Sequence, residues 1–252
     1  MTHSENTPEA RGPVHFATTH WTRVLASRGE APEAREALSQ LCADYYAPVV
    51  AFLKHETRSE DRARDLAHAF FERILEYHGL EGAHPARGRF RSYLLGALKH
   101  FRSHQRELES RAKRGGGAPH VPLESGSNDS DLVAVADPHS DPDAAVFDRA
   151  WGLCILGRAL EQLARDARAS GTFDAFEILK PWLSGNADSP TQTQAQAARK
   201  LGLSDGAFRL ALHRLRRRFR EEVKAEIAKT VPHPGEIPDE LNHLITAVSR
   251  GT

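Results

Sequence analysis

The side chains with the clearest chemical potential in this sequence are arginines and lysines, which gather in two segments. Residues 87–114 carry nine of them against Glu107 and Glu109, and residues 199–220 carry eight against Asp205 alone. Guanidinium and ammonium groups concentrated on a helix are the expected footprint of contacts to phosphates. A solvated charged helix is the alternative for either segment taken alone. The recurrence of the pattern favours two nucleic-acid-binding surfaces.

The net charge of the whole chain hides this pattern. Thirty-four Lys and Arg balance 34 Asp and Glu, so the formal net charge is zero, which by itself argues against a nucleic-acid partner. Between the two basic segments, however, residues 118–143 carry acidic side chains and neither Lys nor Arg. The net charge is therefore zero because two basic segments cancel an acidic stretch. The composition of this stretch is typical of a flexible, solvated linker.

The second basic segment has the pattern of a helix-turn-helix. A first helix through Gln196 ends at Gly202, where a tight turn needs left-handed backbone, and Ser204 caps the second helix. Ala198 provides a small side chain where the two crossed helices must approach closely. The apolar residues expected to form their shared core are Leu201, Leu203, Phe208, Leu212 and Leu215.

In a helix-turn-helix, residues at the start of the second helix face base edges and later arginines bind phosphates. The candidate DNA-binding residues are Ser204, Asp205, Ala207, Arg209, His213, Arg214, Arg216 and Arg217. The alternative is an ordinary helical hairpin with an arginine-rich back. Spacing and charge together favour DNA binding.

The elements that must position these residues are predicted to be helices. We expect helices near Trp21, from Pro32 to a break or kink at Pro48, from Ser59 to Gly79 and over 90–101. Further helices are predicted from Pro142 to near Gly171, from Phe173 to Gly185 with an interruption at Pro181, in the helix-turn-helix, and in the tail through Leu241, Leu244, Ile245 and Val248.

The fold class predicted is all-α, with two small helical domains joined by a flexible acidic linker. Composition supports this, because 40% of residues are hydrophobic and helix-forming residues are abundant. The predicted divisions are a disordered tip over 1–15, a helical domain over 16–114, the linker over 115–141, a helix-turn-helix domain over 142–230, and a tail over 231–252.

Composition also bears on location. No apolar run approaches the roughly 18 residues of a membrane span, and the N-terminus lacks the apolar core of a signal peptide. The two cysteines, Cys42 and Cys154, cannot form a disulfide framework and belong to no CxxC pair. We therefore expect a cytoplasmic protein without a membrane partner.

These features resemble a known family, the bacterial RNA polymerase sigma factors of the extracytoplasmic-function group, in a subgroup with extended termini. The second half resembles their region 4 in Ala197-Ala198-Arg199-Lys200-Leu201-Gly202-Leu203-Ser204, Gly206-Ala207-Phe208-Arg209 and Leu212-His213-Arg214. The first half resembles region 2 in Ser59-Glu60-Asp61, Asp65-Leu66, Phe70-Phe71-Glu72-Arg73 and Arg89-Phe90-Arg91-Ser92-Tyr93-Leu94. Ala67-His68-Ala69 stands where the family usually has Gln-Glu, and His100 or Ser103 stands where an asparagine is common.

The resemblance implies a sigma factor that binds core RNA polymerase, through its β′ clamp and β subunits, and directs promoter recognition and melting. It places polymerase contacts on Asp61, Asp65, Leu66, Phe70 and Arg73. It places contacts to the −10 region of promoter DNA on Arg87, Arg89, Arg91, Lys99, Arg102 and Arg106. The −35 element would be read by the helix that Ser204 begins. An anti-sigma or other regulatory protein is a further partner that the family suggests.

Two other functions fit parts of the sequence. One is a stand-alone helix-turn-helix transcriptional regulator whose first domain is a dimerisation or effector module. The other is a histidine-dependent metal hydrolase, since His100 and His104 are spaced to share one helix face. The chain offers no HExxH motif and no obvious third ligand, so we predict no enzyme, no metal site and no cofactor. Phe90, Tyr93 and Phe101 could aid duplex opening, but the helical stripe favours a core role for Tyr93 and Phe101.

Overall fold

A computed structural model describes residues 32–76, 89–113, 142–183 and 193–249. Throughout these described residues the regular structure is helical, without strands, which confirms the predicted all-α class. The elements are α2 (Pro32–Thr57), α3 (Glu60–Glu76), α4 (Phe90–Lys113), α5 (Pro142–Ala169), α6 (Phe173–Leu179), η3 (Lys180–Trp182), α7 (Gln194–Lys200), α8 (Asp205–Ala228), η4 (Pro234–Glu236) and α9 (Ile237–Ser249). The expected helix near Trp21, the linker over 115–141, and Gly79 and Gly185 lie outside the described residues.

Local sequence signals account for most helix ends. The Ser204 hydroxyl accepts a hydrogen bond from the Ala207 amide at 3.3 Å and so caps α8, as predicted. Thr193 caps α7 through a capping box with Gln196. At the end of α5, Gly171 has a φ of 67°, and the Thr172 amide donates to the Ala167 carbonyl at 2.8 Å. Each of these signals lies within a few residues of the helix end that it fixes.

The sequence predicts a break or a kink at Pro48, and the break is wrong, because α2 runs as one helix from Pro32 to Thr57 with the proline inside it. Proline in a helix interior costs about 3 kcal/mol through its missing N–H and its ring. The helix places Tyr45, Val49 and Phe52 in the core. Burying each such side chain stabilises the fold by about 1.5–3 kcal/mol, so packing on both sides of Pro48 outweighs the cost of the proline.

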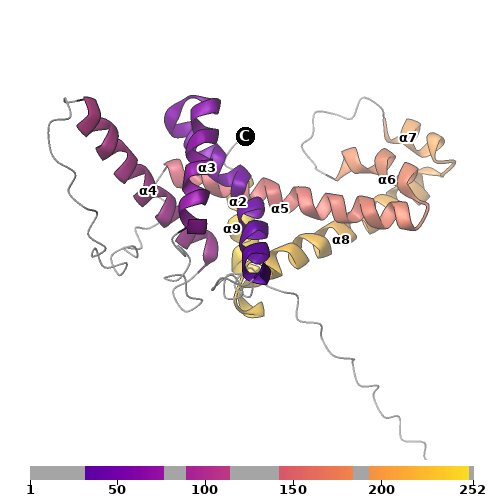
Figure 1. Ribbon diagram of the computed structural model, residues 1–252. Helices are drawn as coiled ribbons and strands as arrows, with labels where there is room; N and C mark the ends of the chain where they lie inside the picture. Colours follow the sequence, from indigo (N-terminus) through magenta and orange to yellow (C-terminus); the bar gives the residue numbers. More distant parts are fainter. Residues whose placement is uncertain (1–31, 77–88, 114–141, 184–192, 250–252) are drawn as a thin grey trace, which may run out of the picture.

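The core of the described residues consists of two clusters that share the long helices α5 and α8. The first joins α2, α3 and α4 to the first half of α5, the end of α8, and α9. The second joins the remainder of α5 to α6, α7 and the start of α8. Figure 1 shows α5 and α8 extending away together from the α2–α4 and α9 end towards α6 and α7.

The two predicted halves of the chain contribute to one core in this structure. Phe147, Trp151 and Ile155 of α5 belong to the same buried cluster as Phe52 and Phe90. The structure therefore does not confirm two independently packed domains. The division into two domains with a flexible linker stays a prediction. None of the described helices has the length and apolar character that crossing a bilayer requires.

Candidate nucleic-acid interface

The α7–turn–α8 unit has the geometry of a helix-turn-helix. Gly202 adopts a φ of 65° in the turn, and the Leu203 amide donates to the Ala198 carbonyl at 2.9 Å. Ala198 is buried, as the close approach of the helices requires, and Phe208 packs edge-on against Trp182 with ring centroids 6.1 Å apart. The core prediction was wrong for Leu203, which is 37% exposed because the turn directs it away from the buried cluster.

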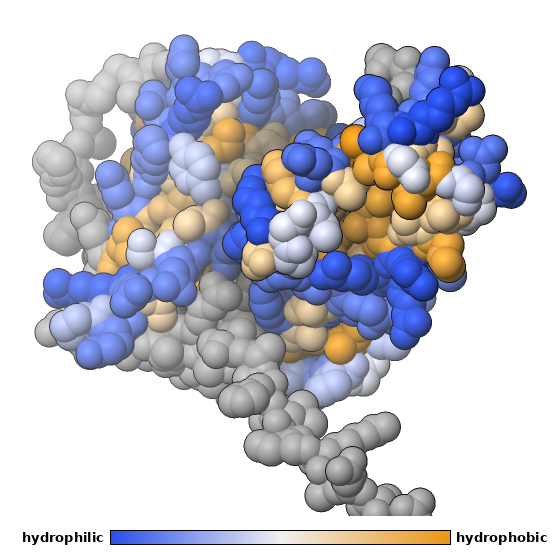
Figure 2. Space-filling model, turned by 90° about the vertical axis from the view of Figure 1, so that its right-hand side faces the viewer, coloured by the Kyte–Doolittle hydropathy of each residue, from blue (hydrophilic) through white to orange (hydrophobic). Residues whose placement is uncertain are grey.

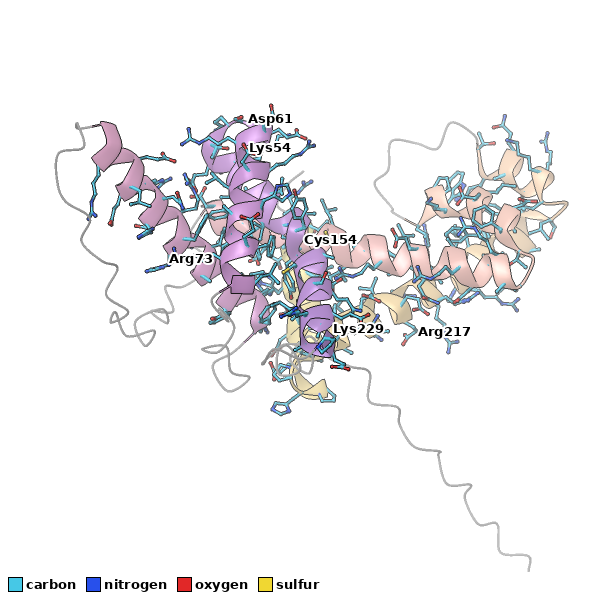
Figure 3. All side chains as sticks on the ribbon, viewed as in Figure 1. Lys54, Asp61, Arg73, Cys154, Arg217 and Lys229 are labelled. Carbon is cyan, nitrogen blue, oxygen red and sulfur yellow. The ribbon has the colours of Figure 1, made fainter. Side chains whose placement is uncertain are left out.

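The residues predicted to contact the −35 element share one property, which is access to solvent. Ala207 is half-buried, and the exposed members are Ser204, Asp205, Arg209, His213, Arg214, Arg216 and Arg217. Figure 3 shows Arg217 projecting from α8 on the side away from α5. Arg216 is held in place, because its Nη2 and Nε donate to the Trp182 carbonyl at 2.7 and 3.2 Å. The exposed face of α8 is therefore basic from Arg209 to Arg220, between the exposed acids Asp205 and Glu221.

One side of α8 lines an open groove of about 730 Å³. Its basic lining residues are Arg209, His213, Arg216 and Arg220, which are spaced to fall on one helical stripe, and its other lining residues are Leu183, Gln194, Leu212 and Phe219. Figure 2, in which the α6–α8 end faces the viewer, shows hydrophilic side chains around an apolar surface at this end. Arg220 was missing from the predicted site, although its spacing of four from Arg216 was a usable signal. The groove can accept an anionic strand or phosphate.

The residues predicted to bind the −10 region are placed very differently. Arg87 lies outside the described residues. Arg89 and Arg91 both pair with Glu240 of α9, each through its Nε at 2.8 Å. The Arg91 side chain is 6% exposed. Its Nη1 also donates to Asp148 of α5 at 2.7 Å. Arg91 is therefore not accessible to DNA in this structure, and its contact with the −10 region stays a prediction.

The C-terminal part of α4 shows a second internal pairing. Arg102 is buried and donates to the Glu56 carboxylate of α2 from Nε at 2.9 Å and Nη2 at 2.5 Å, so it too is inaccessible to DNA in this structure, and its DNA contact stays a prediction. Arg106 is 62% exposed while its Nη2 lies 2.8 Å from the same carboxylate, and Lys99 is half-buried. Unlike the α8 residues, the α4 cations are not gathered on one accessible face.

Two of the carboxyl groups that hold these arginines, Asp148 and Glu56, have lowered pKa values. Burial alone raises the pKa of Asp148, but the hydrogen bond from His243 and the charge of Arg91 outweigh burial. Burial likewise raises the pKa of Glu56, but hydrogen bonds and charge from Arg102 and Arg106 outweigh burial and lower this pKa below its ordinary value. Both carboxyl groups are therefore ionised partners, which makes the pairs charge-assisted.

The predicted polymerase contacts on α3 are partly accessible. Asp61 and Asp65 are exposed, and Leu66 and Arg73 are half-buried. Figure 3 shows Asp61 near Lys54 at one end of α3, with Arg73 farther along the helix. Phe70 is 2% exposed and packs against Phe101 with ring centroids 5.5 Å apart, so it lies in the core of this structure, and its contact with polymerase stays a prediction.

Comparison with protein-family models, with curated proteins and with solved structures gives no match. Across the described stretches of chain, no three His, Cys, Asp or Glu side chains come together as a metal site would require. Among the predicted site residues, those of α8 place several cations on one accessible face.

Proposed function

We propose that this chain is a sigma-type initiation factor of the cytoplasm, a non-enzymatic protein that binds core RNA polymerase and directs it to promoters. The observation that carries the proposal is the exposed basic face of α8, presented by a helix-turn-helix whose turn and cap have the required local geometry. The major groove of DNA is wide enough to admit an α-helix and displays a distinct pattern for each base pair. The side of the first turns of α8 that carries Asp205 and Arg209 is exposed and suits such a docking.

The position of each arginine along α8 determines whether it suits a contact to bases or to phosphates. Arg209 lies one turn into the helix, where its side chain can reach base edges. Arg214 and Arg217 lie farther along and are suited to phosphates, which fix the register of the protein on DNA. Arg220 extends the same basic surface beyond the residues that the sequence suggested.

Polymerase binding rests on α3. Asp61 and Asp65 present carboxylates to solvent at the start of this helix, and the resemblance assigns such residues to the β′ clamp. The arginines at the start of α4 would act at the −10 region after leaving their present partners. An anti-sigma protein is a further partner in this proposal, suggested by the resemblance alone.

A stand-alone helix-turn-helix regulator is the second candidate, and one observation favours it. The α8 face is already exposed, while Arg89 and Arg91 are paired internally. A chain in this state can bind an operator through α8 without using α4. The two candidates differ in whether core polymerase is required.

Run-off transcription with purified core RNA polymerase and a library of promoter fragments tests the proposal. We expect promoter-specific transcripts on adding this chain. The Asp61→Asn, Asp65→Asn double variant should bind core more weakly, because it removes two exposed charges from α3. Asp174→Asn, an exposed acid on α6, is the matched control and should bind core normally. Specific DNA binding without core, together with no transcript, would support the regulator and overturn the sigma proposal.

A further inference from the structure

The start of α4 is held by a buried charge cluster formed by Arg89, Arg91, Asp148, Glu240 and His243. The Glu240 side chain is 0% exposed, and its two carboxylate oxygens lie 2.8 Å from Arg91 Nε and from Arg89 Nε. Asp148 pairs with Arg91 at 2.7 Å and lies 3.0 Å from His243 Nε2. The cluster therefore connects α4 to α5 and α9.

A buried cluster of charged side chains contributes less to the stability of a fold than its number of ion pairs suggests. Removing charges from water costs several kcal/mol per ion, and apolar residues of the same volume often stabilise a fold as well or better. Arg91 also lies over the Trp151 ring, with its guanidinium carbon 5.1 Å from the ring centroid. Both carboxylates of the cluster come from the C-terminal half of the chain, Arg91 comes from α4, and Arg89 directly precedes α4.

Guanidinium groups bind carboxylate and phosphate through the same planar array of N–H donors. While Glu240 accepts from Arg89 and Arg91, those donors cannot bind a nucleic-acid phosphate. We propose that Glu240 is an internal competitor of nucleic acid, and that α9 withholds Arg89 and Arg91 until it is displaced. This inference rests on the proposed function in taking α4 as a DNA-binding helix.

The docking of α9 depends on a close approach to α5. A Cβ atom on Gly152 would lie 2.9 Å from Val248 Cγ2 and 3.7 Å from Leu244 Cγ. Leu244 is buried in the first core cluster, and Val248 packs against it. A larger side chain at Gly152 would therefore force α9 away from α5 without changing any charge. This offers a second way to release the arginines.

Glu240→Gln in the full chain tests the competition directly. The probe is a fluorescent duplex of random sequence, titrated without polymerase across a range of salt concentrations. Arg91 keeps its pairing with Asp148 in this variant, so one further phosphate contact, from Arg89, should steepen the slope of log K against log salt by about 0.9. A fourfold rise in salt should then cost the variant roughly three- to fourfold more affinity than it costs the unsubstituted chain. Asp239→Asn removes the same charge from an exposed neighbour on α9 and should leave the slope unchanged.

Two further variants separate the competition from simple loss of a charge. Gly152→Leu should steepen the slope as Glu240→Gln does, although it retains every carboxylate. Adding Arg89→Ala and Arg91→Ala to Glu240→Gln should return the slope to that of the unsubstituted chain. Unchanged slopes for Glu240→Gln and Gly152→Leu, with helical circular dichroism retained, would overturn the proposal. Loss of fold in both would also overturn it, because α9 would then be a permanent part of the core.

Transcription by the unsubstituted chain distinguishes failure of this inference from failure of the proposed function. Promoter-specific transcripts combined with unchanged slopes would reject the competition and keep the sigma function. Steeper slopes combined with no transcripts would keep Glu240 as a competitor of DNA and reject the sigma function.

Discussion

Replacing Arg91 with methionine should destabilise the chain strongly. Arg91 is the one side chain of the buried charge cluster that contacts both Asp148 and Glu240. Removing one member of a buried ion pair typically costs about 3–5 kcal/mol, because the remaining charge is left buried without its partner. Here Glu240 retains Arg89 and Asp148 retains His243. We therefore expect a loss near the lower limit, about 3 kcal/mol.

Urea unfolding followed by tryptophan fluorescence measures this loss, because Trp151 lies directly beneath Arg91. Arg111→Met is the matched control, since Arg111 lies on α4 but is exposed, and its cost should stay within about 0.5 kcal/mol. A change in the unfolding free energy below about 1 kcal/mol for Arg91→Met would refute the reasoning. It would mean that the cluster is open in the free chain.

Three further outcomes follow from the structure. The folded pKa of Asp148 is lowered, so its stabilisation is complete above the unfolded value of about 4 and is lost as pH falls through the folded value; Asp148→Asn should flatten this acid-side loss in an unfolding series. Arg209→Ala should weaken −35 recognition by about 1–3 kcal/mol if it bonds a base edge, whereas an equal loss on all sequences in a binding assay would identify a phosphate contact. Burial raises the pKa of the Cys42 thiol to about 11, so alkylation of this residue at pH 8, followed by mass spectrometry, should be far slower in the folded chain than in urea.

The sequence was sufficient to predict the features that depend on interactions between residues close together in the chain. Ser204 caps α8 because its hydroxyl reaches an amide three residues away, and Gly202 supplies the turn because it tolerates a positive φ. Both signals act within a few residues, so no knowledge of the tertiary fold is needed. For the same reason the exposed arginines of α8 could be identified from helical spacing alone.

The pairing of the α4 arginines could not be predicted, because it depends on residues far away in the sequence. Arg91 and Glu240 are separated by 149 positions, and Arg102 and Glu56 by 46. The burial of Phe70 could not be predicted for a related reason, since a helical stripe does not reveal which of its members a partner helix covers. Charge density indicated where cations gather but could not reveal which of them the fold neutralises.

An arginine in the interior and an arginine on DNA require two different states of the chain. If opening the buried charge cluster costs about 3–5 kcal/mol, the open fraction of the free chain is roughly 10⁻² to 10⁻⁴. A partner that binds only the open state then loses apparent affinity by the same factor. Under the sigma proposal, core polymerase must supply this free energy, so Glu240→Gln should bind core more tightly than the unsubstituted chain. Equal affinities in a fluorescence titration with core would show that polymerase binding does not require the release of α9.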